Sequence, residues 1–173
     1  MINRRTTGFM ASALAVPLAA LTLAACGGGN NTATASNTST AADGTPATLG
    51  VANNGSLGKI LTNSKGSTLY LFQKDSGTKS ACTGACAASW PPLRDSHKPV
   101  VSSGSSASKA TTAPRSDGAS QVVYNGHPLY LFSGDQNPGD TNGQGVNAFG
   151  GLWYAVSPTG ATVTASGSAS AGY

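Results

Sequence analysis

The feature that most constrains this chain is a stretch of seven residues that occurs twice, 60 positions apart. Residues 69–75 read Leu-Tyr-Leu-Phe-Gln-Lys-Asp, and residues 129–135 read Leu-Tyr-Leu-Phe-Ser-Gly-Asp. Each copy is followed downstream by one tryptophan, Trp90 after the first and Trp153 after the second. Solenoid folds need about three or more stacked repeats to bury a continuous core. Two copies therefore predict a single domain with internal pseudo-symmetry.

The residues around the two copies favour strands over helices. The chain contains no glutamate and is rich in glycine, serine and threonine, which are poor helix formers. Asn125-Gly126 lies between two apolar runs, and this dipeptide is the strongest short-range hairpin signal because both turn residues adopt positive φ. Three β-hairpins are predicted, which pair residues 60–62 with 68–72, 121–124 with 128–132, and 152–156 with 161–163.

These elements predict an all-β domain in which two similar antiparallel, hairpin-based repeats pack as one sandwich- or barrel-like unit. We place this domain at residues 49–163, with the repeats at about 57–93 and 120–158. Residues 102–120 are rich in Ser, Ala, Thr and Gly, so we expect a long surface loop there with room for a short irregular strand. Residues 164–173 are predicted to be a disordered tail.

The N-terminal residues 1–25 have the order of a bacterial signal peptide, with Arg4 and Arg5 ahead of an apolar stretch. The apolar stretch is too short to span a bilayer comfortably. The run Leu-Ala-Ala before Cys26 resembles the lipobox of bacterial lipoproteins, and the resemblance implies that the Cys26 thiol is acylated. The adjacent arginines leave two export routes open, the general secretory route and the twin-arginine route.

The segment that follows, residues 26–48, consists mainly of Gly, Asn, Thr, Ala and Ser. Such a segment buries too little apolar surface to offset its ordering entropy, so we predict a flexible tether with a reach of roughly 25 Å. The folded part is then expected at the extracytoplasmic face of the cell membrane, anchored through Cys26. Beyond the signal peptide, eight Lys and Arg residues are scattered among six Asp. A balance this small argues against nucleic acid as a partner.

Cys82 and Cys86 are the two cysteines that remain beyond Cys26. An even pair outside the cytoplasm predicts a disulfide, and one helical turn or a tight loop brings two such residues within bridging distance. The alternative is a copper or thiol-redox site in which both thiolates and His97 act as ligands. A zinc site with His127 as a fourth ligand matches no common spacing.

The repeated motif has two interpretations. In a strand, Tyr70 and Phe72 share one face and the flanking leucines share the other, so the strand is predicted to be buried on both sides. Asp75 falls just after the strand, where its carboxylate can accept backbone N–H groups and fix a turn. These residues are therefore either core and turn residues or an aromatic–carboxylate ligand site used twice. We favour the first interpretation, because duplicated motifs usually encode the fold.

Taken together, the motifs resemble those of the bacterial secreted-repeat lipoproteins. The resemblance rests on the two Tyr-x-Phe-x-x-Asp copies, the Cys-x-x-x-Cys-Ala-x-x-Trp-Pro-Pro stretch at residues 82–92, and the lipobox. It covers essentially all of residues 49–163, and it supports the expected fold and location without implying a reaction. The residues that match the family motif are Tyr70, Phe72, Asp75, Tyr130, Phe132 and Asp135.

No catalytic constellation stands out in the sequence. It contains no Gly-x-Ser-x-Gly run and no nucleophile with a base at a known spacing. We therefore expect a monomeric, non-enzymatic binding or envelope-associated module without a cofactor, whose partner is an envelope protein or a small ligand. The copper or thiol-redox protein remains the alternative. The loop at residues 135–145 is either a calcium-binding loop or an ordinary Gly/Asn/Pro-rich loop.

Overall fold

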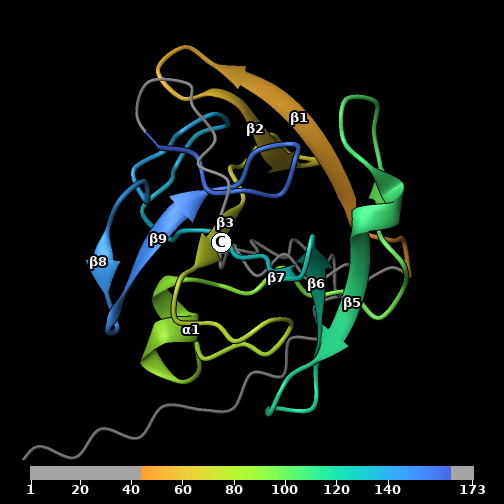
Figure 1. The fold of residues 1–173 in the computed structure, drawn as a ribbon. Helices are drawn as coiled ribbons and strands as arrows, with labels where there is room; N and C mark the ends of the chain where they lie inside the picture. The colour runs from red at the N-terminus through yellow and green to blue at the C-terminus, as the bar shows by residue number, and fades with distance from the viewer. Residues whose placement is uncertain (1–43, 165–173) are drawn as a thin grey trace, which may run out of the picture. The chain divides into compact units, whose positions relative to one another are not determined.

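A computed structural model describes residues 44–164 of the chain. The predicted signal peptide, Cys26, most of the predicted tether and residues 165–173 of the predicted tail lie outside the described residues. Figure 1 shows how the described elements are arranged. In chain order they are β1 (Thr48–Asn54), β2 (Gly58–Asn63), β3 (Tyr70–Phe72), α1 (Ala85–Ser89), β4 (Val100–Val101), the 3-10 helix η1 (Ala107–Lys109), β5 (Ala110–Pro114), β6 (Ser120–Tyr124), β7 (His127–Pro128), β8 (Asn147–Ala148) and β9 (Gly151–Ala155).

The strands form three small sheets of three strands each, with the orders β2-β1-β4, β5-β6-β7 and β3-β9-β8. Neighbouring strands are antiparallel except for β1 and β4, which are parallel. In Figure 1, β3 lies near the centre, with β9 and β8 on one side of it and β5, β6 and β7 on the other. The predicted all-β class is confirmed, and within residues 44–164 the three sheets do not join into a closed barrel.

All three predicted hairpins are present. The closing pairs across their turns are Thr62–Thr68, Tyr124–His127 and Val156–Thr162. At the second turn, Asn125 and Gly126 have φ angles of 50° and 85°, as the Asn-Gly signal requires. The hairpin pattern therefore identified all three of these turns.

Each half also contains an outer strand that is not part of any predicted hairpin. In the first half β1 pairs with β2 along its whole length, and in the second half β5 pairs with β6. β5 is the short strand for which the predicted loop at residues 102–120 left room, and it is regular over five residues. Both outer strands contain mostly small or polar side chains, so their conformation depends on pairing with a neighbour more than on local propensity.

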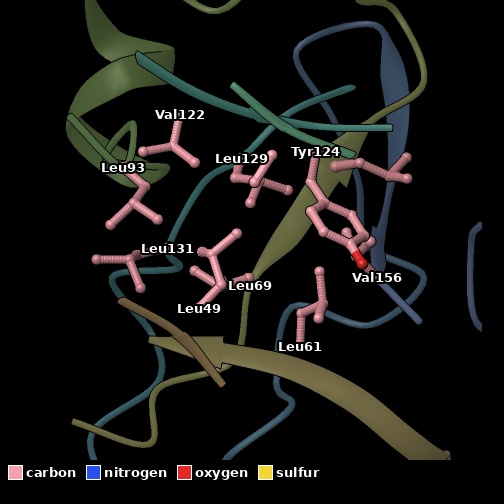
Figure 2. Close-up of a cluster of buried hydrophobic side chains, with 11 residues drawn as sticks. Leu49, Leu61, Leu69, Leu93, Val122, Tyr124, Leu129, Leu131 and Val156 are labelled. Atoms are coloured by element: carbon pink, nitrogen blue, oxygen red, sulfur yellow. The ribbon is translucent and has the colours of Figure 1, made fainter. Parts of the chain in front are cut away.

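The core consists of two clusters that lie on opposite faces of the motif strands. The two leucines of each motif and their neighbours form the first, the leucine cluster, shown in Figure 2. The aromatic residues of each motif belong to the second, the aromatic cluster. The motif strands are thus buried on both sides, as predicted. The leucine cluster comprises Leu49, Leu61, Leu69, Leu71, Leu93, Ala110, Val122, Tyr124, Leu129, Leu131 and Val156. The aromatic cluster comprises Leu57, Ile60, Tyr70, Phe72, Cys82, Cys86, Trp90, Tyr130, Trp153, Ala155 and Val163, with Phe132 partly buried against it.

A closed ring of three backbone hydrogen bonds occurs once in each half. Leu69 N donates to Leu61 O at 3.0 Å, Leu61 N donates to Val156 O at 2.7 Å, and Val156 N donates to Leu69 O at 3.0 Å. The second ring has the same form and runs from Leu129 N to Val122 O, from Val122 N to Leu93 O and from Leu93 N to Leu129 O, at 2.9, 2.8 and 2.9 Å. In each ring, two members come from one repeat and the third comes from the other repeat.

The two repeats exchange their tryptophan segments. The motif strand of the first repeat, β3, pairs with β9 of the second, which places Phe72 opposite Trp153. The second motif follows β7 and forms no regular strand of its own, but Tyr130 makes an isolated bridge to Pro92 in the first repeat's segment after α1. At the centre, Tyr70 and Tyr130 bond each other through both backbone N–H groups at 2.9 Å. The two repeats are therefore related by a pseudo-two-fold axis, and the motif of each pairs with the tryptophan segment of the other.

Candidate functional site

The motif tyrosine of each repeat donates a hydrogen bond to the motif aspartate of the other repeat. The Tyr70 hydroxyl lies 2.7 Å from Asp135 Oδ2, and the Tyr130 hydroxyl lies 2.9 Å from Asp75 Oδ2. Both tyrosines are completely buried. The six motif residues therefore come together at the pseudo-symmetry axis, and the side chains of each motif are completed by its counterpart.

Each motif aspartate is also held by its own turn. The backbone N–H groups of Asp75 and Asp135 donate to the carbonyl three residues earlier. The second carboxylate oxygen of Asp75 accepts from Ala81 N at 2.8 Å, and that of Asp135 accepts from Asn142 N at 2.9 Å. The predicted turn-fixing role of these aspartates is therefore present, and the bond to the tyrosine of the other repeat is an addition that the sequence does not predict.

Burial raises the pKa of all four side chains in the two tyrosine–aspartate pairs. Burial, followed by the neighbouring carboxylates, raises the pKa of Tyr70 and of Tyr130 well above the ordinary tyrosine value. Burial also raises the pKa of Asp135, and it raises the pKa of Asp75 to about 6. The hydroxyls therefore stay protonated at neutral pH, while Asp75 sits close to its titration point.

The shift at Asp75 predicts a specific pH dependence of stability. Its folded pKa of about 6 lies above the ordinary value of 3.8, so the folded state binds a proton more readily than the unfolded state between these two values. Stability rises with pH only where the unfolded state binds more protons, so here it falls as the pH rises from about 4 to about 7. We expect wild type to lose stability relative to Asp75→Asn over this range, measured by urea denaturation. An increasing advantage of wild type with pH contradicts the shift.

Four aromatic rings form a continuous stack between the two tyrosine–aspartate pairs. The central pair, Trp90 and Trp153, has ring centroids 3.9 Å apart and planes within 5° of parallel. Phe72 stacks on Trp153 at 4.1 Å, and Phe132 stacks on Trp90 at 4.2 Å. Each outer ring thus belongs to the opposite repeat from the tryptophan that it covers. The stack joins the two halves through dispersion and burial rather than through polar contacts.

The motif tyrosines meet this stack edge-on. Tyr70 lies 5.4 Å from Trp90, and Tyr130 lies 5.1 Å from Trp153, both at nearly right angles. Edge-to-face contacts are a favoured geometry, because the positive ring edge approaches the negative ring face. Each tyrosine consequently has its ring against a tryptophan and its hydroxyl against a carboxylate.

Two glycines that the sequence pattern did not single out permit this packing. A Cβ atom on Gly143 would lie 2.8 Å from the Trp90 ring and 2.9 Å from the Tyr70 ring. A Cβ atom on Gly151 would lie 2.8 Å from the Phe72 ring. The backbone therefore serves as part of the wall around the stack. The signal available in the sequence was their position, since Gly143 lies shortly before β9 and Gly151 is its first residue.

A buried arginine lies beside one of the two pairs. Arg115 donates to Ser80 Oγ at 2.8 Å, to Gln121 Oε1 at 2.6 Å and to the Cys82 carbonyl at 2.7 Å. Ser80 Oγ also lies 2.8 Å from the Tyr130 hydroxyl oxygen. This network ties the Tyr130 pair to the rest of the second half. Sequence reasoning missed Arg115 because it lies in a polar turn that carries no strand signal.

Cys82 and Cys86 form the predicted disulfide, in which Cys86 belongs to α1 and Cys82 lies three residues before that helix begins. Both cysteines are buried in the aromatic cluster. His97 instead contacts Asp95, with Nδ1 3.2 Å from the Asp95 carboxylate. No three His, Cys, Asp or Glu side chains within residues 44–164 are grouped as a metal ion would need. The described structure therefore does not bring His97 together with the cysteine pair.

Removal of the disulfide gives a prediction of modest size. A bridge that closes so short a loop restricts the unfolded chain little, and it contributes about 2 kcal/mol by loop-closure entropy. We expect Cys82→Ser/Cys86→Ser to lower the free energy of unfolding by about this amount while the near-ultraviolet circular dichroism of the stack is kept. A free-thiol assay on the unfolded wild type should find neither cysteine reactive before reduction. If the variant is completely unfolded, the disulfide contributes much more to stability than we predict.

The carboxylates of the loop at residues 135–145 accept hydrogen bonds from backbone N–H groups of the same loop. Asp140 accepts from the backbone N–H groups of Gln136 and Asn137 at 2.9 and 2.8 Å. Asp135 is engaged by Tyr70 and Asn142. These contacts match the interpretation of the loop as a Gly/Asn/Pro-rich turn segment.

His127 is partly buried, and burial lowers its pKa.

The chain matches one protein family, described as a secreted repeat of unknown function, over residues 51–94 and again over residues 111–157. The two matched segments correspond to the two halves described above. No match was found among curated proteins or among solved structures. Among the described residues, no helix has the length and apolar character needed to span a membrane.

Proposed function

Because the chain belongs to this family of secreted repeats, we propose that it is a lipid-anchored, extracytoplasmic module that acts by binding rather than by catalysis. The proposal has two parts, a lipid on Cys26 and a folded domain that presents its loops to a partner in the envelope. No cofactor is required by either part.

The observation that carries the binding role is that the motif tyrosines and aspartates bond one another in the interior, so their side chains are not free to bind a ligand. The Tyr70 and Tyr130 rings are fully buried, and their hydroxyls already bond Asp135 and Asp75. A motif that holds the two halves together leaves recognition to the connecting loops, which a rigid core positions. The domain is in this sense a scaffold whose repeated residues encode shape rather than chemistry.

The start of the folded domain supports a tethered arrangement. The Asp95 carboxylate accepts from the Ala47 backbone N–H, and the Ala47 carbonyl accepts from Val100 N at 2.9 Å. Asp95 is buried, yet the hydrogen bonds from Ala47 and His97 hold its pKa below the ordinary value. Ala47, close to the start of the described residues, is therefore fixed to the fold by contacts on both its N–H and its carbonyl.

Substitution of the anchor cysteine tests the lipid anchor. We expect Cys26→Ala to move the protein from the membrane fraction to the soluble exported fraction, and to abolish incorporation of labelled palmitate. Each acyl chain contributes about 0.8 kcal/mol per buried methylene, so membrane binding should depend strongly on the lipid. The matched control is Cys82→Ser/Cys86→Ser, which alters the other two cysteines and should remain in the membrane fraction. Retention of Cys26→Ala in the membrane contradicts the anchor.

The binding role is tested separately from the anchor. Crosslinking in intact cells, followed by capture of the full-length protein, should yield a recurrent envelope partner whose crosslinks map to loops such as residues 135–145. Turnover of a substrate by purified protein, abolished by a single side-chain substitution, would contradict a binding role. Because Cys26→Ala affects only location, failure of one part leaves the other measurable.

A further inference from the structure

The aromatic cluster combines two kinds of side chain that protein chemistry uses for one-electron oxidation. Indole and phenol rings lose an electron more easily than any other aromatic side chain. Here the two indoles are stacked at 3.9 Å, and each has a phenol ring edge-on at 5.1 or 5.4 Å. A phenol that loses an electron must also lose its proton, and each hydroxyl already donates to a carboxylate at 2.7 or 2.9 Å.

We propose that this cluster is a one-electron relay, which accepts an oxidising equivalent from a diffusible one-electron oxidant and holds it as a neutral tyrosyl radical on Tyr70 or Tyr130. The inference goes beyond the binding role, because it assigns chemistry to residues that a scaffold needs only for shape. The reciprocal arrangement gives two equivalent end points, one in each repeat.

The step balances with the groups present and the external oxidant. The oxidant takes one electron from Trp90 and is reduced by one electron. The Trp90 radical cation then recovers an electron from Tyr70, whose hydroxyl proton moves to Asp135 along the existing hydrogen bond. The products are neutral Trp90, a neutral Tyr70 radical and protonated Asp135. The second route uses Trp153, Tyr130 and Asp75 in the same roles.

The burial pattern indicates where the electron leaves. Trp90, Trp153 and Phe72 are almost completely buried, whereas Phe132 is only partly buried and covers Trp90. An oxidant at the surface therefore approaches the stack most closely at the Phe132 end, next to Trp90. Tyr70 and Tyr130 are shielded from solvent, which would protect a radical there from reaction with water and thiols.

Another buried tyrosine provides a matched control. Tyr124 is completely buried, but its hydroxyl donates to the Pro158 carbonyl at 2.8 Å and has no carboxylate partner. A carbonyl accepts a hydrogen bond but does not take up the proton at neutral pH. Burial alone therefore does not make a tyrosine an end point of the proposed relay.

The experiment uses the full-length mature protein with photogenerated tris(bipyridine)ruthenium(III) as the oxidant and a cobalt(III) amine as the sacrificial acceptor. Electron paramagnetic resonance after freezing should show a tyrosyl radical in wild type and in Tyr124→Phe. The signal should be lost in Tyr70→Phe/Tyr130→Phe and should decay faster in Asp75→Asn/Asp135→Asn. A signal that survives in Tyr70→Phe/Tyr130→Phe, or is lost in Tyr124→Phe, overturns the proposal.

A measurement on Tyr124→Phe, in which the other buried tyrosine is removed, decides the question if the double variants do not fold. Electron–nuclear double resonance on the trapped radical should detect a hydrogen-bonded proton that exchanges slowly after transfer into D2O, because it is shared with a buried carboxylate. A radical without such a proton, or with one that exchanges at once, lies on an exposed tyrosine and overturns the proposal.

Discussion

Replacement of Trp153 by alanine is expected to lower the free energy of unfolding by about 3–5 kcal/mol. Trp153 is completely buried and contacts three rings at once, those of Phe72, Trp90 and Tyr130. Its removal leaves a cavity between the two halves that neither strand can close, because both are fixed by backbone pairing. Since small domains are stable by only about 5–15 kcal/mol, the loss should be visible as a large shift of the urea midpoint.

The neighbouring residue on the same strand provides the control for this substitution. Tyr154 points to the other side of β9 and is only partly buried, so Tyr154→Ala should cost clearly less. Trp153→Phe should fall between the two, because it keeps a stacked ring and loses only part of the contact area. If Trp153→Ala and Tyr154→Ala cost the same, the stack does not hold the halves together.

The second large effect is a coupling between repeats. In a double-mutant cycle, Tyr70→Phe and Asp135→Ala should show a coupling of about 1–3 kcal/mol, because the hydrogen bond between them is buried and its acceptor is a carboxylate. Tyr130→Phe and Asp75→Ala should behave alike. Each cycle is measured from equilibrium unfolding of four purified proteins.

The mismatched cycle shows whether the exchange between repeats is real. Tyr70 and Asp75 belong to the same motif, but each bonds a residue of the other repeat. Tyr70→Phe and Asp75→Ala should therefore add to within about 0.5 kcal/mol. A larger coupling within one motif than between the two motifs would mean that each repeat closes on itself, contrary to the structure.

Much of the local structure was predictable from the sequence because short-range signals specify it. Asn125-Gly126 requires positive φ and produces the second hairpin turn. The alternation of Leu with Tyr and Phe placed the two apolar faces of the motif strand correctly, and both faces are buried. The spacing of Cys82 and Cys86 likewise allowed the disulfide that closes this short segment.

The cross-repeat contacts could not be predicted, because nothing local distinguishes pairing within a repeat from pairing between repeats. Phe72 faces Trp153, and Tyr70 bonds Asp135, although a suitable tryptophan and aspartate occur closer in the sequence. The same holds for the outer strands, β1 and β5, whose small side chains give little signal without their partners. The role of Gly143 appears only when a ring of another segment lies against it.

The exchange of tryptophan strands has a consequence for the order of folding. The first repeat is synthesised before the segment that completes its sheet, since β3 pairs with β9 near the end of the described chain. Until then its aromatic face has no native cover, and contacts between distant segments form slowly. Folding of this protein therefore includes an interval in which the first repeat lacks the strand that completes its sheet, until that strand of the second repeat is available.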